Sequence, residues 1–419
     1  MKNVKKISIV LITIMLFSNA FLVWSVDGFA IDNDELSFYE VDEYIIYELG
    51  YDFFINHSKA IHQVNELYNQ LPTNRLGEII YPQYFGGMYI NDEGNLVMLL
   101  VDSPDELGIV SRLVDEAISK TTEFSLNEIM SVHHQLTYFF LNQYDYPSVS
   151  NIASSWTDIV NNRVVVSLFD FTDEAILAFK EDIIQSPLII FEEYATTNEE
   201  KLLPNLNERN SFSLPHHTNN DSPTIGLSNI TITPGDTIRV GSSNGGVCSV
   251  GFRVNNNGRS GFVTAAHCGA IGSSIFNSAG NQIGTINSRF LGHIDAAFVA
   301  LNSNVNVSGT LPPATHITPN ASTPTVGQIV IARGSNNGSR SGTIAQINAN
   351  ANIGGIGQVT NTIIANFRSD GGDSGGIAIS QSGGQAHNVQ GIVITRIGNT
   401  QSRISRTSEI TSRTGWRLQ

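Results

Sequence analysis

The spacing of hydrophobic residues divides the chain into two parts with different periodicity. After the first 40 residues, apolar positions recur at helical spacing, and the stretches 87–101 and 156–169 each read as a strand, a tight turn and a second strand. We expect a helix after each hairpin, beginning near Ser103 and Thr172, because a capping residue there precedes acidic residues and an apolar run. The repeated pattern predicts two α+β units between residues 31 and about 220.

From residue 221 to the C-terminus, short strands alternate with turns. Stretches rich in Val, Ile and Thr are separated by Asn- and Gly-rich turns such as 255–258 and 335–338, and helical spacing returns only at 408–416. This pattern is typical of an all-β barrel or sandwich. The polar, proline-containing stretch 196–220 between the two parts predicts a linker and a zone for proteolytic cleavage.

Residues 1–30 have the pattern of a secretory signal peptide. Three lysines precede an apolar run from residue 7 to residue 17, and small residues suited to cleavage follow. The run is shorter than the ~20 residues of a membrane-spanning helix, although residues 21–24 could extend it into an anchor. We expect cleavage and secretion, with no stable membrane insertion afterwards. Export would let the two cysteines, Cys248 and Cys268, form a disulfide worth ~3 kcal/mol.

Charge is divided unevenly along the chain. Residues 221–419 hold 12 Arg, no Lys and 6 acidic residues, a net charge of +6, whereas residues 1–220 carry −21. Opposite charge favours association of the two parts; two unrelated domains with different surfaces are the alternative. The arginines are scattered, which argues against a nucleic-acid partner. His133 and His134 are adjacent in an expected helix and face different ways, so we expect no shared metal there.

Three short motifs in the basic part carry chemistry together. A Gly-rich turn presents the Ser374 hydroxyl beside the backbone N–H groups of Gly372 and Ser374, which can hold an oxyanion. His267 follows an apolar strand, and Asp295 precedes a run apolar enough to be buried, where a carboxylate needs a partner. We expect Ser374 to attack a carbonyl, His267 to carry the proton and Asp295 to orient the imidazole. His293 is a competing candidate for the base.

The order His, Asp, Ser along an all-β chain resembles chymotrypsin-fold serine proteases, and in particular the bacterial streptogrisin and α-lytic protease branch. The motifs that carry the resemblance lie at 248–252, 261–268, 294–299 and 372–376. The resemblance implies two six-stranded antiparallel β-barrels with the site between them, and peptide hydrolysis without a metal or organic cofactor. A non-catalytic peptide-binding module and an esterase using the same three residues are the alternatives.

The resemblance also implies different roles for the two parts of the chain. Residues 31–220 would be a pro-region that assists folding of the protease domain, residues 221–419, and inhibits it until removed. In a buried position beneath the catalytic turn, Asp373 needs a cationic partner, and the resemblance implies an ion pair with Arg333.

Two arginines occupy positions where the chain departs from these relatives. Arg368 lies where they carry a cysteine-containing segment, and Arg396 lies where a Ser-Gly-Gly strand for substrate pairing is expected. If both line the specificity pocket, they favour an acidic side chain at the cleaved residue; alternatively both point to solvent. Residues 221–408 contain no Glu, so a Glu-directed enzyme would spare most of its own protease domain.

Overall fold

The computed structural model describes residues 49–75, 79–101, 117–142, 146–195, 200–201, 229–311, 315–381 and 386–419. The expected signal peptide, the expected helix after Ser103 and most of the linker lie outside these residues. All described residues belong to one compact unit, Val41–Gln419. Across the described ranges, no helix combines the length and apolar character needed to cross a membrane.

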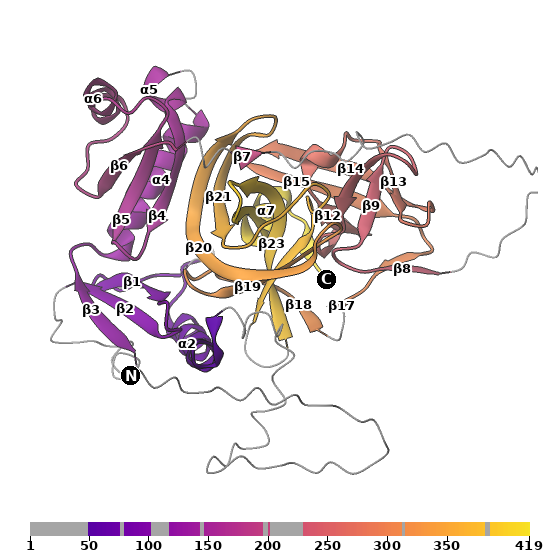
Figure 1. Cartoon of the computed structure of the whole chain (residues 1–419), viewed down its shortest axis with the longest axis horizontal. Coiled ribbons are helices and arrows are strands. Elements are labelled where there is room, and N and C mark those ends of the chain that lie inside the picture. The colour runs from indigo at the N-terminus through magenta and orange to yellow at the C-terminus, as the bar shows by residue number, and fades with distance from the viewer. Residues whose placement is uncertain are drawn as a thin grey trace, which may run out of the picture. The chain divides into compact units, whose positions relative to one another are not determined.

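Two hairpin units make up the part before the linker (Figure 1). Its elements are α2 (Tyr51–Gln70), β1 (Phe85–Ile90), β2 (Leu96–Val101), β3 (Ile118–Thr122), α4 (Leu126–Asn142), α5 (Pro147–Ser150), β4 (Ile152–Asp158), β5 (Arg163–Leu168), α6 (Asp173–Asp182) and β6 (Ile189–Glu193). The short strand β7 (Glu200–Lys201) follows inside the linker. The hairpins β1–β2 and β4–β5 are antiparallel, and a parallel strand joins each one, β3 beside β2 and β6 beside β5. The predicted α+β region is therefore confirmed.

Local sequence explains how these units form. The hairpin turns place Gly94 and Asn162 at positive φ, which Gly and Asn tolerate best. The Thr172 hydroxyl accepts a hydrogen bond from the backbone N–H of Ala175 and caps α6, as predicted. Apolar faces of α2 and of α4 pack against the strands, so each unit has its own hydrophobic cluster.

A first barrel is built from the strands between residues 237 and 301. They are β9 (Thr237–Val240), β10 (Gly246–Ser249), β11 (Arg253–Asn256), β12 (Arg259–Thr264), β13 (Ser274–Asn277), β14 (Gln282–Gly292) and β15 (Ile294–Leu301). They pair in the order β10-β9-β13-β14-β15-β12-β11. Because β10 and β11 are successive parts of one stretch of chain, the row closes on itself as six strands. The short β25 (Arg417–Leu418) extends β11, and β8 (Ile230–Ile232) pairs with β16 (Val305–Val307).

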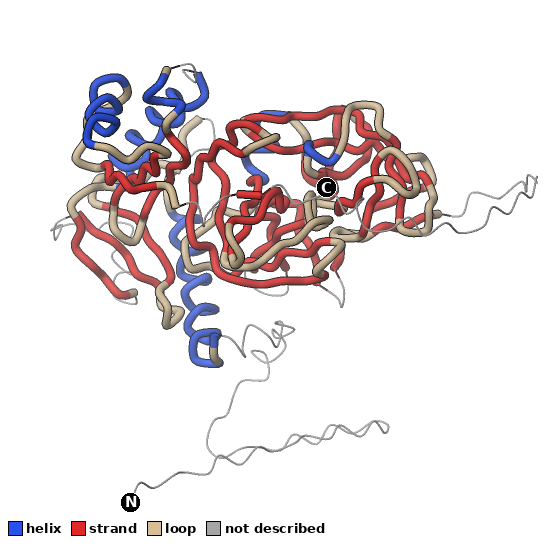
Figure 2. Tube along the Cα trace, turned by 45° about the horizontal axis from the view of Figure 1, so that its top comes forward, coloured by secondary structure: helices blue, strands red, loops and turns tan. Residues whose placement is uncertain are grey.

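A second ring of strands follows, formed by residues 329–406. Its members are β19 (Ile329–Gly334), β20 (Gly338–Ile353), β21 (Gly357–Ala365), β22 (Ile377–Gln381), β23 (Ala386–Ile397) and β24 (Gln401–Arg406). The pairings β19–β20, β20–β21, β21–β24, β24–β23, β23–β22 and β22–β19 close a six-stranded antiparallel barrel. On its border β17 (Thr310–Leu311) pairs with β18 (Thr315–Ala321), which pairs with β23. The predicted fold class is confirmed, and Figure 2 shows strand through most of this part of the chain.

Buried apolar side chains from both barrels form one cluster, which includes Phe262, Phe298 and Ile392. The C-terminal helix α7 (Thr407–Thr414) adds Ile410 to it, close to the predicted 408–416. The long strand β20, which Figure 1 shows curving along the second barrel, also pairs with β4. The sheet of the second barrel therefore continues into the second hairpin unit.

Candidate active site

His267 is held at the end of a first-barrel strand. The buried β12 residues Phe262 and Val263 lead into a single 3₁₀ turn, Ala266–Cys268, which carries the histidine. Cys268 forms the predicted disulfide with Cys248 of β10, with 6.3 Å between the Cα atoms. The histidine thus stands on a segment fixed on one side by strand pairing and on the other by a covalent link.

Asp295 lies in the buried strand β15 and is fully shielded from solvent. Its Oδ1 accepts a hydrogen bond of 2.9 Å from the backbone N–H of His267, and its Oδ2 lies 2.5 Å from Nδ1 of the imidazole. A buried carboxylate requires such partners. Both carboxylate oxygens therefore set the position and the ring orientation of His267.

Ser374 lies on the other side of the imidazole, with Oγ 2.9 Å from Nε2 of His267. Burial alone would lower the pKa of His267, but the charge of Asp295 and its hydrogen bond outweigh burial and the charge of Arg289, so the pKa is raised. A raised pKa makes the imidazole a stronger base. The structure brings Ser374, His267 and Asp295 into one hydrogen-bonded row.

The turn around Ser374 leaves two backbone donors unused by the described residues. The N–H groups of Asp373, Gly375 and Gly376 donate to carbonyls, whereas those of Gly372 and Ser374 have no acceptor in the described part of the chain. Gly372 has a φ of 102°, which favours glycine. These two donors are free to hold an oxyanion.

Serine hydroxyl groups hold the turn around Ser374 through the carbonyl of Gly372. The Oγ atoms of Ser249 and Ser335 each donate to the carbonyl of Gly372 at 2.8 Å, and Ser249 Oγ accepts from the N–H of Ser335 at 2.8 Å. The N–H of Ser249 donates to the carbonyl of Ser374. Ser249 follows Cys248 in the motif 248–252, but the local sequence does not reveal its role, because Gly372 lies 123 residues further along the chain.

The expected ion pair between Arg333 and Asp373 is wrong. Asp373 accepts four hydrogen bonds, two at Oδ1 from the N–H groups of Asn336 and Asn337 and two at Oδ2 from the Asn337 side chain and the Asp370 N–H. All four donors are amides, which stabilise a buried carboxylate without a cation.

Strand geometry explains why Arg333 is turned away from Asp373. A Cβ added to the next residue, Gly334, would lie 2.6 Å from Asp373 Oδ1, so that position faces the carboxylate. Successive side chains of β19 point to opposite faces. The aliphatic carbons of Arg333 accordingly pack against Gly235.

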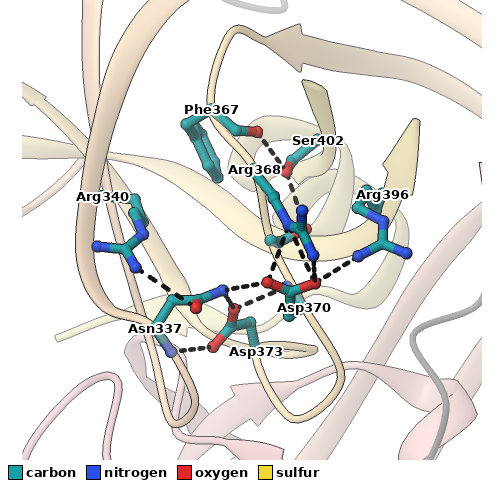
Figure 3. Close-up of polar contacts among 9 residues, drawn as sticks. Asn337, Arg340, Phe367, Arg368, Asp370, Asp373, Arg396 and Ser402 are labelled. Carbon is teal, nitrogen blue, oxygen red and sulfur yellow. Dashed lines mark hydrogen bonds and ion pairs between the residues drawn. The ribbon is translucent and has the colours of Figure 1, made fainter. Parts of the chain in front are cut away.

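Arg368 and Arg396 converge on one carboxylate, that of Asp370 (Figure 3). Arg368 donates through Nε and Nη2, and Arg396 donates through Nη1. Partial burial alone would raise the pKa of Asp370, but hydrogen bonds from Arg368 and Asn337 and the arginine charges lower it overall. The two predicted pocket residues are therefore neighbours, linked by Asp370, which no sequence motif marks as a site residue.

The backbone of His293, the competing histidine, is hydrogen-bonded to β21, whereas the Asp295 carboxylate and Ser374 Oγ are bonded to the ring of His267. The backbone N–H of His293 donates to the carbonyl of Gln358, and its own carbonyl accepts from the N–H of Thr360. Burial and the charge of Arg413 lower the pKa of His293. Within the described ranges, no group of three or more His, Cys, Asp or Glu side chains is placed to hold a metal ion.

Comparison with known proteins places relatives on both parts of the chain. A Pro-like N-terminal domain matches residues 50–131, and a Pro-like C-terminal domain matches residues 127–194. Streptogrisin-C of Streptomyces griseus is 36% identical over 166 residues, 38% of this chain and 34% of that protein. Streptogrisin-A of the same organism is 34% identical over 148 residues, 35% of this chain and 47% of that protein.

The chain thus covers less than half the length of either streptogrisin. Among solved structures, Nocardiopsis protease (NAPase) is 27% identical, with a TM-score of 0.40 over 45% of this chain and 99% of that one. The resemblance found in the sequence is confirmed: part of the chain is similar in sequence to two bacterial streptogrisins, and Pro-like domain models match the region ahead of its β-barrels.

Proposed function

We propose that the chain is the proenzyme of a secreted serine endopeptidase, with Ser374 as nucleophile, His267 as general base and Asp295 as the residue that orients the base. The observation that carries this proposal is the hydrogen-bonded row from Ser374 Oγ through the imidazole to the Asp295 carboxylate. Both distances lie within reach of proton transfer or strong hydrogen bonding. The similarity to streptogrisins supports the same chemistry.

The hydrogen-bonded row of Ser374, His267 and Asp295 supports peptide hydrolysis through an acyl-enzyme. Ser374 Oγ attacks the peptide carbonyl carbon as its proton passes to Nε2 of His267, and the carbonyl oxygen becomes an oxyanion between the N–H groups of Gly372 and Ser374. Collapse of this intermediate breaks the C–N bond, and Nε2 returns the proton to the leaving amine. Water then attacks the acyl-enzyme with the same histidine as base, releasing the acid and restoring Ser374.

Asp295 acts through the imidazole. With Nδ1–H donating to the carboxylate, Nε2 is left as the acceptor that faces Ser374. The buried negative charge then stabilises the imidazolium that forms during each step. Neither role requires the carboxylate to take up a proton.

Residues 31–220 act in this proposal as a pro-region that binds residues 221–419, assists their folding and blocks the site. The Pro-like matches support this role. So does the pairing of β7 with β23, which sets Lys201 opposite Arg396 and Glu200 opposite Ile397. β23 supports the catalytic turn, since the N–H of Gly375 donates to the carbonyl of Val393. A segment paired along that strand would exclude a substrate peptide from the same edge.

Secretion and cleavage of a signal peptide at residues 1–30 complete the proposal, which rests there on the pattern of the N-terminal sequence. Activation would follow cutting in the stretch 196–220.

Hydrolysis of a peptide and of a matched simple ester by the secreted protein tests the proposal. The proposal expects both activities, with Ser374→Ala reducing each to background and the exposed-site control Ser412→Ala leaving both unchanged. Hydrolysis of the ester alone would favour an esterase. Binding of peptide without hydrolysis of either substrate would favour a non-catalytic module.

A further inference from the structure

We propose that Arg396 binds an acidic side chain of the substrate, so that the enzyme cleaves next to glutamate in preference to uncharged residues. This inference rests on the proposed function and adds the class of substrate. It is carried by a cluster of three charged residues, Arg368, Asp370 and Arg396, that adjoins the catalytic turn (Figure 3).

The cluster is joined to the catalytic turn by backbone hydrogen bonds. The carbonyl of Asp370 accepts from the N–H of Asp373, the residue before the nucleophile. Ser402 of β24 holds the same segment, because its Oγ contacts the carbonyl of Phe367 at 2.7 Å and the Ser369 hydroxyl at 2.8 Å. These hydrogen bonds tie the cluster to the segment that carries the nucleophile.

Arg396 lies on the edge of β23 that accepts an added strand. Lys201 of β7 pairs with it in antiparallel register, so the backbone of this edge is open to pairing with an added strand. Such an edge supplies main-chain hydrogen bonds, and nearby side chains then select among the bound residues. On that edge, the side chain of Arg396 forms an ion pair with the Asp370 carboxylate.

The guanidinium group of Arg396 has an N–H donor without an acceptor among the described residues. Its Nη1 donates to Asp370, whereas its buried Nε has no partner among the described residues. A guanidinium carries five N–H donors, and a buried donor left unpaired is unfavourable. A substrate carboxylate would supply the missing acceptor. Arg368 differs, because its Nε and Nη2 are both directed at Asp370 and its side chain is 55% exposed.

The local charge also favours an anion. Two guanidinium groups and one carboxylate leave the cluster with a net positive charge, and the nearby Asp373 carboxylate is bonded to four amide donors rather than to these arginines. Arg340 adds a further positive charge next to Asn337. Arg368 neutralises Asp370, which would otherwise repel an acidic substrate.

The distribution of glutamate along the chain agrees with this specificity. Residues 221–408 contain no Glu, whereas the linker 196–220 contains Glu199, Glu200 and Glu208. An enzyme that cleaves next to glutamate could cut its own linker and would spare its protease domain up to Glu409.

The inference is tested with the enzyme obtained from the full-length chain after maturation. The substrates are peptides that differ only in having Glu, Gln or Leu at the cleaved residue. We expect kcat/KM for Glu to exceed that for Gln by roughly 10- to 100-fold, as charge-assisted hydrogen bonds are about twice as strong as neutral ones in a part-buried site. Arg396→Gln should bring the Glu/Gln ratio to about 1, while Asp370→Asn should raise it by freeing positive charge.

Controls keep this inference separate from the proposed function. Arg259→Gln removes an exposed arginine of β12 and should leave the ratio unchanged. Titration of active sites with a fluorophosphonate counts the folded enzyme in every variant. A wild-type ratio near 1 with normal titration, or an unchanged ratio in Arg396→Gln, overturns the specificity while the protease function stands. Loss of titration in wild type overturns both.

Discussion

His267 is the proposed general base, and its surroundings have opposite effects on its pKa. Burial disfavours the protonated ring, whereas the Asp295 carboxylate favours it, and the carboxylate prevails so that the pKa is raised. Because the base must be neutral to accept a proton, activity should be lost as pH falls through this raised pKa.

Asp295→Asn tests that balance. Removing the charge should lower the pKa of His267, so the acid limb of the kcat/KM profile moves to lower pH, while kcat falls by roughly 10⁴-fold because the imidazole loses its orienting partner. The measurement is kcat/KM against pH for both proteins. An acid limb that stays in place would show that Asp295 does not set the basicity of His267.

Gly372 offers a second test at the residue scale. A methyl group there would lie 2.9 Å from Ser335 Oγ on a backbone with φ of 102°, so Gly372→Ala should displace an oxyanion donor and reduce kcat by roughly 10²–10³-fold. Gly415→Ala is the matched control, because Gly415 also has positive φ but faces open space. The control should cost about 1 kcal/mol of stability and leave kcat unchanged. Equal kcat losses in both variants would mean that strain alone is responsible.

At the scale of elements, contacts between the Pro-like part and the barrels include two buried histidines. His57 of α2 accepts a hydrogen bond through Nε2 from the N–H of Ile329 in β19, and His133 of α4 lies 3.0 Å from Asn361 of β21. Burial lowers the pKa of His57 to about 3. Burial and the nearby His134 lower that of His133 to about 4, against the effect of Asn361. Both imidazole rings are therefore uncharged at neutral pH while the two parts are joined.

These histidines should make the association weaken in acid. Separated histidines would titrate near the ordinary pKa of 6.5, so below that pH release of the two parts takes up protons, and the association constant should fall up to tenfold per pH unit for each ring. The pH window runs from about 6.5 down to about 3 for His57. The Ser374→Ala chain, cut in its linker by an added protease, allows dissociation to be followed from pH 7 to pH 5.

Glutamine at position 57 removes one titrating group while keeping an acceptor. His57→Gln should reduce the slope of the pH dependence by one proton, whereas the exposed His62→Gln should not. A slope that is the same in all three proteins would rule out His57 as the sensor.

The sequence predicted the hairpins, the capped helix and the triad because each depends on local pattern: alternating apolar residues, a Thr172 cap, and short motifs around His267 and Ser374. It could not predict which face of β19 carries Arg333, because a shift of one residue along a strand moves a side chain to the opposite face of the sheet. Nor could it predict that Thr157 bonds to Ile347, 190 residues away, because nothing local marks the pairing of β4 with β20.

At the scale of the whole molecule, charge and sheet continuity both favour association of the two parts. Residues 1–220 carry −21 and residues 221–419 carry +6. Added 31–220 segment should therefore slow the mature enzyme, and the inhibition should weaken as salt rises from about 0.01 M to about 1 M, where screening shortens from ~30 Å to ~3 Å. No inhibition at low salt would contradict a role as an inhibitory pro-region.

The central claim is that Ser374 becomes covalently bonded to the substrate's acyl group, and mass spectrometry of the fluorophosphonate-treated mature protein tests it most directly. The account predicts one adduct, on the peptide that contains Ser374, lost in Ser374→Ala and strongly slowed in His267→Ala. Labelling of another residue, or of Ser374 at the same rate without the imidazole, would contradict it.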